Sequence, residues 1–234
     1  MRGEGRPSVS VDHVVGAIHK SKAVLWDLDG TLIDSDPYWV TAERALLESY
    51  GGTWDDALAE AMQGASLPVL TRLLGERGVA LPADEIVRTL TDEVMRMELE
   101  HLPWVEGAWK LLARLTAAGI PSVLVTGSPR VIADNVLRQA PTGAFIGAVS
   151  GSDALPPKPS PEPYLYAARM AGIDSGNPQA MRDCVIFEDS LPGLTAAHAS
   201  GAVVVAVTGH ARVDVTGCGL YDYMIRDYRE VCGS

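Results

Sequence analysis

Short apolar runs alternate with longer amphipathic stretches along most of the chain, and this alternation limits the folds available to it. The apolar runs have the length and composition of buried strands. The stretches between them repeat apolar residues at helical spacing, and several end at glycine, as helices often do. The strand-like runs lie at residues 22–27, 119–128, 145–152, 182–190 and 201–209. This order predicts βαβ units and an α/β fold built on a parallel sheet.

One region departs from the alternation, because residues 37–102 contain helical patterns and no strand-like run. An all-helical insert placed directly after the first strand predicts a second, smaller domain, an α-helical cap over the carboxyl edge of the sheet. The predicted division is an N-terminal extension at 1–22, a core at 23–36 and 103–234, and a cap at 37–102.

Composition disfavours several classes of partner. The formal net charge is -11 and the chain has no Lys/Arg run, so we expect no binding to nucleic acid or to an anionic membrane surface. No segment has the length and hydropathy of a membrane span, and the first residues lack the pattern of a signal peptide. Cys184, Cys218 and Cys232 are scattered, which predicts free thiols and a cytoplasmic protein.

Polar residues follow the strand-like runs, although they are spread over most of the chain. Asp27 ends the first run, Thr126 ends the second, and Glu188 and Asp189 end the run at 182–190. Lys158 lies in a proline-dense loop that leads into a helix. Because parallel strands point their carboxyl ends at the same crevice, we expect these side chains to converge there.

The residue types indicate chemistry on a phosphate group. Asp27, Glu188 and Asp189 would form a hard, oxygen-rich site of the kind that Mg²⁺ prefers. Lys158 and the Thr126 hydroxyl could hold an anion beside it. Gly30 and Gly127 would let backbone N–H groups approach that anion closely.

A phosphoryl-transfer site of this kind needs a nucleophile and an acid/base. Asp27 is the candidate nucleophile, and it would form an aspartyl-phosphate. Asp29 lies two residues further on, where it could protonate the leaving group and then activate water.

Four segments resemble the motifs of the haloacid dehalogenase (HAD) superfamily in order and approximate spacing: DLDGTLIDS, VTGS, KPSPEP and FEDSLPG. The resemblance covers roughly residues 23–207, and the helical insert looks like the cap of the phosphoglycolate phosphatase and β-phosphoglucomutase branch. It implies a Rossmann-like core and magnesium-dependent phosphate-ester chemistry.

By motif position, the resemblance implies a role for each site residue. Asp27 looks like the nucleophile and Asp29 like the acid/base, while Thr126 and Lys158 look like phosphate binders. The implied Mg²⁺ ligands are Asp27, the backbone carbonyl of Asp29, and Asp189, with Glu188 as direct or water-mediated support.

Within this superfamily a phosphatase acting on a small phosphorylated metabolite is the favoured reading. The dehalogenases lack the second aspartate of the first motif, which is present here as Asp29. The mutases usually carry a histidine where this chain has Trp39, and cations in the cap loop where this chain has Gln63 before Gly64.

Two alternatives remain open: a β-phosphoglucomutase-like phosphotransferase, and a non-catalytic phosphate-binding protein. Trp39, Gln63, Gly64 and Arg130 are candidate specificity residues. We expect a monomer or a homodimer.

Overall fold

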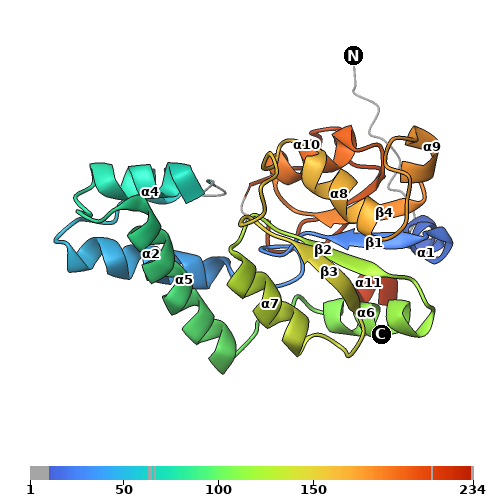
Figure 1. Ribbon diagram of the computed structural model, residues 1–234, viewed down its shortest axis with the longest axis horizontal. Coiled ribbons are helices and arrows are strands. Elements are labelled where there is room, and N and C mark those ends of the chain that lie inside the picture. Colours follow the sequence, from blue (N-terminus) through green and yellow to red (C-terminus); the bar gives the residue numbers. More distant parts are fainter. Residues whose placement is uncertain (1–10, 63–64, 66, 212, 233–234) are drawn as a thin grey trace, which may run out of the picture.

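The computed structural model describes residues 11–62, 65, 67–211 and 213–232. Within them, parallel strands form one sheet in the order β3-β2-β1-β4-β5-β6 (Figure 1). The strands are β1 (Ala23–Trp26), β2 (Ser122–Val125), β3 (Phe145–Val149), β4 (Cys184–Glu188), β5 (Val203–Val207) and β6 (Tyr223–Ile225). The predicted α/β fold with a Rossmann-like parallel sheet is therefore confirmed.

Helices cover both faces of this sheet because successive side chains of a strand point to opposite sides. In β1, Val24 and Trp26 join one apolar cluster, with α1, α6, α7 and α11, whereas Ala23 and Leu25 join a second, with α8, α9 and α10. The helices are α1 (Val11–Lys20), α6 (Ala108–Ala117), α7 (Arg130–Gln139), α8 (Glu162–Met170), α9 (Pro178–Met181), α10 (Leu191–Ala199) and α11 (Arg229–Cys232). The three-layer arrangement leaves the strand ends free to carry a site.

The inserted segment forms a helical cap beside the core, to the left in Figure 1. It contains α2 (Asp36–Ser49), α3 (Asp56–Met62), α4 (Leu67–Glu76) and α5 (Ala83–Glu100), and α5 packs against α2 and α4. The two linkers meet where the backbone N–H of Asp34 donates to the carbonyl of Pro103, at 2.8 Å. The assignment of 37–102 to the cap, with 23–36 and 103–234 as core, stays an interpretation of these elements.

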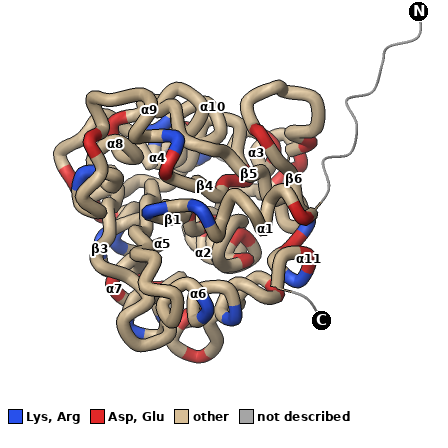
Figure 2. Tube along the Cα trace, turned by 90° about the vertical axis from the view of Figure 1, so that its right-hand side faces the viewer, with Lys and Arg blue, Asp and Glu red and all other residues tan. Residues whose placement is uncertain are grey.

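The ends of the chain add to the core. α1 lies in the predicted extension 1–22 and packs against α11 near the other end. Among the described residues, no helix combines the length and the hydropathy needed to cross a bilayer. Lys and Arg are scattered over several elements and interspersed with Asp and Glu (Figure 2).

An aromatic cluster packs at the carboxyl ends of β1 and β4. The rings of Trp26 and Phe187 stack with centroids 4.6 Å apart, and the Tyr228 ring lies 5.5 and 5.3 Å from them. The Tyr228 hydroxyl donates to the carbonyl of Thr31 at 3.0 Å. A residue near the C-terminus therefore holds the loop that follows β1, in a packing geometry that aromatic pairs favour.

Tyr228→Phe tests this support. It leaves the buried Thr31 carbonyl without its hydroxyl donor, so we expect the free energy of unfolding to fall by about 1–2 kcal/mol. Urea denaturation provides the measurement. Tyr166→Phe, a change at an exposed ring, is the matched control and should change little. Equal stability of Tyr228→Phe and the wild type would show that the hydroxyl does not support the loop.

Candidate active site

Three buried carboxylates meet at the ends of two adjacent strands. Asp27 follows β1, Glu188 ends β4 and Asp189 follows it, and one oxygen from each lies within 4.8 Å of the others. The strand pairing causes this convergence, because the backbone N–H of Asp27 donates to the carbonyl of Phe187 at 3.1 Å. The sheet thus brings together residues about 160 positions apart in the sequence.

Lys158 provides the positive charge of this group. Its Nζ lies 2.5 Å from Oδ1 of Asp27 and 2.7 Å from Oε1 of Glu188, and it also donates to the carbonyl of Val125. The Tyr164 hydroxyl, in the first turn of α8, donates to the same Glu188 oxygen at 3.0 Å. The loop before α8 therefore carries its lysine directly to the strand ends.

The other oxygen of Glu188 is held by the beginning of α10. Oε2 accepts from the backbone N–H groups of Asp189 and Ser190 and from the Ser190 hydroxyl, at 2.9 to 3.1 Å. A side chain at Gly193 would overlap the Glu188 carboxylate, so glycine is required at that position. The Ser190 hydroxyl in turn accepts from the Gly193 N–H, as a helix N-cap does.

Burial and mutual repulsion dominate the electrostatics. Burial, followed by the charge of Glu188, raises the pKa of Asp27 to about 7 against the opposing attraction of Lys158. Burial and the charges of Asp27 and Glu188 hold the pKa of Asp189 well above its usual value. For Lys158, burial would lower the pKa, but the charges of Asp27 and Glu188 outweigh it and hold that pKa well above the ordinary range. Lys158 is therefore a cation in this group, whereas Asp27 and Asp189 are protonated more readily than ordinary aspartates.

Asp29 lies beside this group with its side chain turned to four donors. Oδ2 accepts from the hydroxyls of Ser128 at 2.6 Å and Thr126 at 3.3 Å. Oδ1 accepts from the Ser35 hydroxyl at 2.5 Å and from Nε1 of Trp39 at 3.1 Å. Core and cap both hold this carboxylate, since Trp39 belongs to α2.

The loop between Asp27 and the cap also orients Asp189. The Thr31 hydroxyl donates to Oδ1 of Asp189 at 2.9 Å. Gly30 has a φ of +81°, and a Cβ there would collide with the Asp189 carboxylate. Glycine is suited to both demands, because it adopts positive φ freely and leaves room for the neighbouring oxygen.

The remaining residues that the sequence suggested for phosphate or substrate binding are Gly127, Arg130, Gln63 and Gly64. Gly127 is exposed between Thr126 and Ser128, and its role in phosphate binding stays a prediction. The Arg130 guanidinium donates to the carbonyl of Ala148 at 2.8 Å and lies near Asp134 and Asp153, so a substrate contact stays a prediction for it too. Gln63 and Gly64 lie outside the described residues.

Sequence reasoning left several contacts unassigned: Ser35 and Ser128 on Asp29, Tyr164 and Ser190 on Glu188, and Thr31 on Asp189. Thr31, Ser35, Ser128 and Ser190 stand inside the quoted motifs, so their positions offered a signal. Tyr164 has the pattern of an ordinary helix core residue, and only the packing of α8 on the sheet shows its contact.

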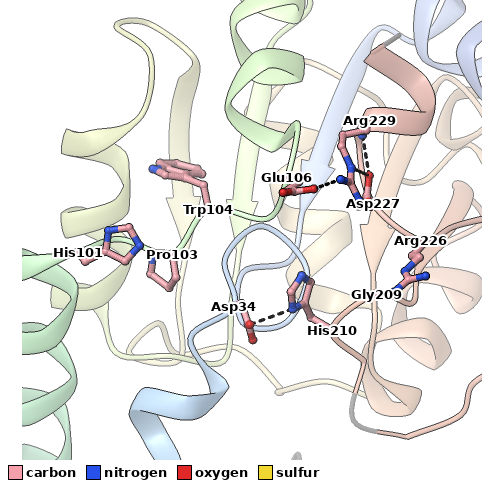
Figure 3. A pocket seen from close by; sticks show the side chains of 10 residues that line it. All are labelled: Asp34, His101, Pro103, Trp104, Glu106, Gly209, His210, Arg226, Asp227 and Arg229. Atoms are coloured by element: carbon pink, nitrogen blue, oxygen red, sulfur yellow. Dashed lines mark hydrogen bonds and ion pairs between the residues drawn. The ribbon is translucent and has the colours of Figure 1, made fainter. Parts of the chain in front are cut away.

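A separate pocket of about 380 Å³ lies at the linkers between cap and core (Figure 3). In it, Nδ1 of His210 lies 2.9 Å from Oδ2 of Asp34, and Arg229 pairs with Glu106 and Asp227. Both linkers contribute to its wall, through Asp34 and Trp104. These pairs connect the linkers to the C-terminal part of the core.

The donor set fits a divalent metal ion. Asp27, Glu188 and Asp189 offer hard oxygen atoms within a short distance of one another, and Lys158 offsets only part of their charge. Such sites suit cations that prefer carboxylate oxygens. Asp29 contributes no side-chain oxygen to this group, so its predicted ligand, the backbone carbonyl, stays a prediction.

Comparison with known proteins identifies the family of this chain. The family model described as haloacid dehalogenase-like hydrolase matches residues 21–201. A phosphoglycolate phosphatase of Neisseria gonorrhoeae is 32% identical over 202 residues, which cover 82% of each chain. Hexitol phosphatase A of Escherichia coli is 29% identical over 192 residues, which cover 82% of this chain and 85% of that one.

A solved structure agrees as well. The putative β-phosphoglucomutase of Thermotoga maritima matches with a TM-score of 0.69 and 25% identity, over 89% of this chain and 96% of that one. The chain therefore belongs to the haloacid dehalogenase-like hydrolases, and it is a phosphoric monoester hydrolase.

Lys158→Met tests the charge balance of the site. Three carboxylates would face one another without a cation, and we expect the metal-free protein to lose about 3–5 kcal/mol of stability near pH 8. The loss should shrink near pH 6, because a protonated Asp27, with its pKa of about 7, no longer repels its neighbours. Thermal unfolding at both pH values, with EDTA present, gives the comparison.

Lys22→Met is the control, since it removes a lysine from an exposed pair with Asp183 and should change stability little at either pH. A Lys158→Met variant with the wild-type unfolding temperature at pH 8 would contradict the account of the site.

Proposed function

We propose that the chain hydrolyses a small phosphorylated metabolite, of the sugar phosphate or phosphoglycolate type, with Mg²⁺ and through an aspartyl-phosphate. One observation carries the proposal: Lys158, Glu188 and Asp189 gather around Asp27 at the ends of β1 and β4, with Asp29 two residues away. Relatives named phosphoglycolate phosphatase and hexitol phosphatase A support the substrate class.

The first half of the reaction forms the covalent intermediate. A carboxylate oxygen of Asp27 attacks the phosphorus atom, the bond from phosphorus to the ester oxygen breaks, and Asp29 gives a proton to the leaving alcohol. The substrate phosphate would lie beside Lys158, whose positive charge offsets its negative charge. The Thr126 hydroxyl, which donates to Asp29 in the substrate-free protein, would turn to donate to the phosphate.

The second half releases phosphate. Asp29, now ionised, takes a proton from a water molecule whose oxygen attacks the phosphorus. The bond from phosphorus to Asp27 then breaks, which restores the carboxylate. Ser128 holds Asp29 on the core side, and the same carboxylate serves both steps.

Mg²⁺ would be held by Asp27, Asp189 and the backbone carbonyl of Asp29. When bound, it would offset the carboxylate charge and polarise the phosphate oxygens. Both oxygens of Glu188 already accept hydrogen bonds from protein groups, which favours a water-mediated contact from Glu188 over a direct one.

Trp39 favours hydrolysis over mutase chemistry. Its Nε1 donates to Asp29 from the cap, and an indole N–H is a donor only, so it cannot relay protons as a histidine does. A non-catalytic phosphate-binding role is disfavoured because Asp27, Asp29 and Lys158 are all present and adjacent. The cap would exclude bulk water when it closes over the substrate.

The setting of the enzyme belongs to the proposal as well. Cys184, Cys218 and Cys232 are free thiols, which suits a reducing cytoplasm. A monomer or a homodimer acting on a small molecule is proposed.

The proposed mechanism is tested by hydrolysis of a panel of phosphate esters with Mg²⁺ and then with EDTA. We expect phosphate release that EDTA abolishes, and a loss of at least about 10³-fold in kcat for Asp27→Asn, which has no nucleophilic oxygen anion. Asp12→Asn, on α1, serves as the control for the loss of one carboxylate. Activity that survives EDTA, or a fully active Asp27→Asn, would contradict the mechanism.

A second experiment separates the phosphatase from the mutase. The enzyme is incubated with a sugar 1-phosphate, a bisphosphate primer and Mg²⁺, and the products are separated by chromatography. We expect free phosphate and unphosphorylated sugar, because the cap offers Trp39 where a mutase has a histidine. Isomerised sugar phosphate without release of phosphate would establish the mutase instead.

A further inference from the structure

A second polar contact joins the cap to the core, apart from the one that Trp39 makes with Asp29. Glu98 lies in the last turn of α5, and its side chain is fully buried. Its Oε2 accepts from Nδ2 of Asn135 on α7, at 3.0 Å, and Asn135 is itself buried. Helices α5 and α7 lie side by side at this point (Figure 1).

The other oxygen of Glu98 is the unusual feature. Among the described residues, Oε1 has no hydrogen-bond partner although it is buried. A buried carboxylate normally needs partners for both oxygens, because its ionised form loses much hydration. The neutral acid tolerates this position better than the anion does.

The surroundings of Glu98 contain no compensating cation among the described groups. The side chains that α7 brings here are the amides of Asn135 and Gln139, and Arg138 is exposed. From the loop after β1, the negative charge of Asp29 acts on Glu98. Burial, followed by this repulsion and against the hydrogen bond from Asn135, raises the pKa of Glu98 to about 7.

Most charged side chains named on the helices that carry Glu98 and pack beside it form pairs with one another. On α5 itself, Glu93 and Glu100 pair with Arg96 on the exposed side. Arg72 and Glu76 of α4 pair with each other in solvent. Helix α2 carries Glu43, a buried carboxylate, and the exposed pair of Arg44 with Glu48.

We propose that Glu98 is a positioning residue: held by Asn135, its neutral carboxyl group seats cap helix α5 against core helix α7, and the seat loosens when that group ionises. Helix α5 also packs against α2, which carries Trp39 onto Asp29. We call the contact between α5 and α7 at Glu98 the seat of α5, and it sets how the cap lies over the acid/base. The contact itself does not depend on the substrate, whereas its kinetic consequence rests on the proposed function.

The size of the effect has an upper bound. Opening the cap hydrates Glu98, and ionisation then favours the open form in proportion to the change in its pKa. A rise from 4.5 to about 7 limits the shift in the opening equilibrium to roughly 300-fold. Because Glu98 is only partly hydrated in the open form, we expect the opening equilibrium to change by about tenfold between pH 5.5 and 8.5.

Hydrogen–deuterium exchange of the substrate-free protein tests the seat directly. Wild type and Glu98→Gln, which cannot ionise, are compared at about pH 5.5 and 8.5. We expect the two proteins to exchange alike at the lower pH in segments 94–101 and 130–139. At the higher pH the wild type should exchange faster in both segments. Glu98→Leu cannot hold Asn135, so it should exchange faster than Glu98→Gln at both pH values.

The control is Glu100→Gln, which removes the same charge from an exposed position two residues away and should behave as the wild type. Equal exchange of wild type and Glu98→Gln at the higher pH would overturn the proposal. So would faster exchange of Glu98→Gln at both pH values, because Glu98 would then act only as a packing residue.

The pH dependence of KM provides a further test, because a purely structural role of Glu98 would not change it. Between about pH 5.5 and 8.5, the KM of the wild type relative to that of Glu98→Gln should rise several-fold, with kcat little changed. A constant ratio would overturn the proposal. The exchange experiment needs no substrate, so a difference in exchange without any hydrolysis would refute only the proposed function. Hydrolysis with unchanged exchange would refute only the role of Glu98.

Discussion

The rest of the site depends on the ion pairs that the ammonium group of Lys158 makes with two buried carboxylates. It lies within hydrogen-bond distance of Asp27 and Glu188, which end adjacent strands, and without it the carboxylates would repel one another in a buried place. A buried ion pair adds little net stability, but removal of one partner is costly. The arrangement therefore makes sense as a constraint imposed by chemistry, since a fold selected for stability alone would place apolar side chains there.

The fold supplies this arrangement through its topology. Strand β1 is central, with β2 on one side and β4 on the other. Residues from three distant parts of the chain therefore meet at the same edge of the sheet, as the parallel alternation predicts. The aromatic cluster of Trp26, Phe187 and Tyr228 packs at the carboxyl ends of β1 and β4. Positioning of the nucleophile thus rests on ordinary core packing.

Much of this could be predicted from the sequence, because strand ends and proline-fixed loops place Asp27, Glu188, Asp189 and Lys158 without knowledge of distances. Within the extension 1–22, Val11–Lys20 form α1. The short elements β6 and α11 follow residue 208.

The rest could not be predicted, for a physical reason that the residues share. Tyr164 and Glu98 stand at helical positions whose spacing says only that they face an interior. Which group lies opposite them depends on how α8 packs on the sheet and how α5 packs on α7, and those are contacts between distant segments. The donors on Asp29 are similar, since they come from the core and the cap at once. A sequence pattern indicates which face of a helix is buried, whereas only the packing of the helices shows which groups its side chains contact.

The central claim is that Asp27 accepts the phosphoryl group and Asp29 completes the reaction. The most direct measurement uses Asp29→Asn with p-nitrophenyl phosphate, whose leaving group needs no proton, followed by acid quench and mass spectrometry of the protein. The account predicts a mass gain of one phosphoryl group, located on the peptide that contains Asp27 and removed by hydroxylamine. An unmodified protein that has released p-nitrophenol over many turnovers, or a phosphoryl group on another residue, would contradict it.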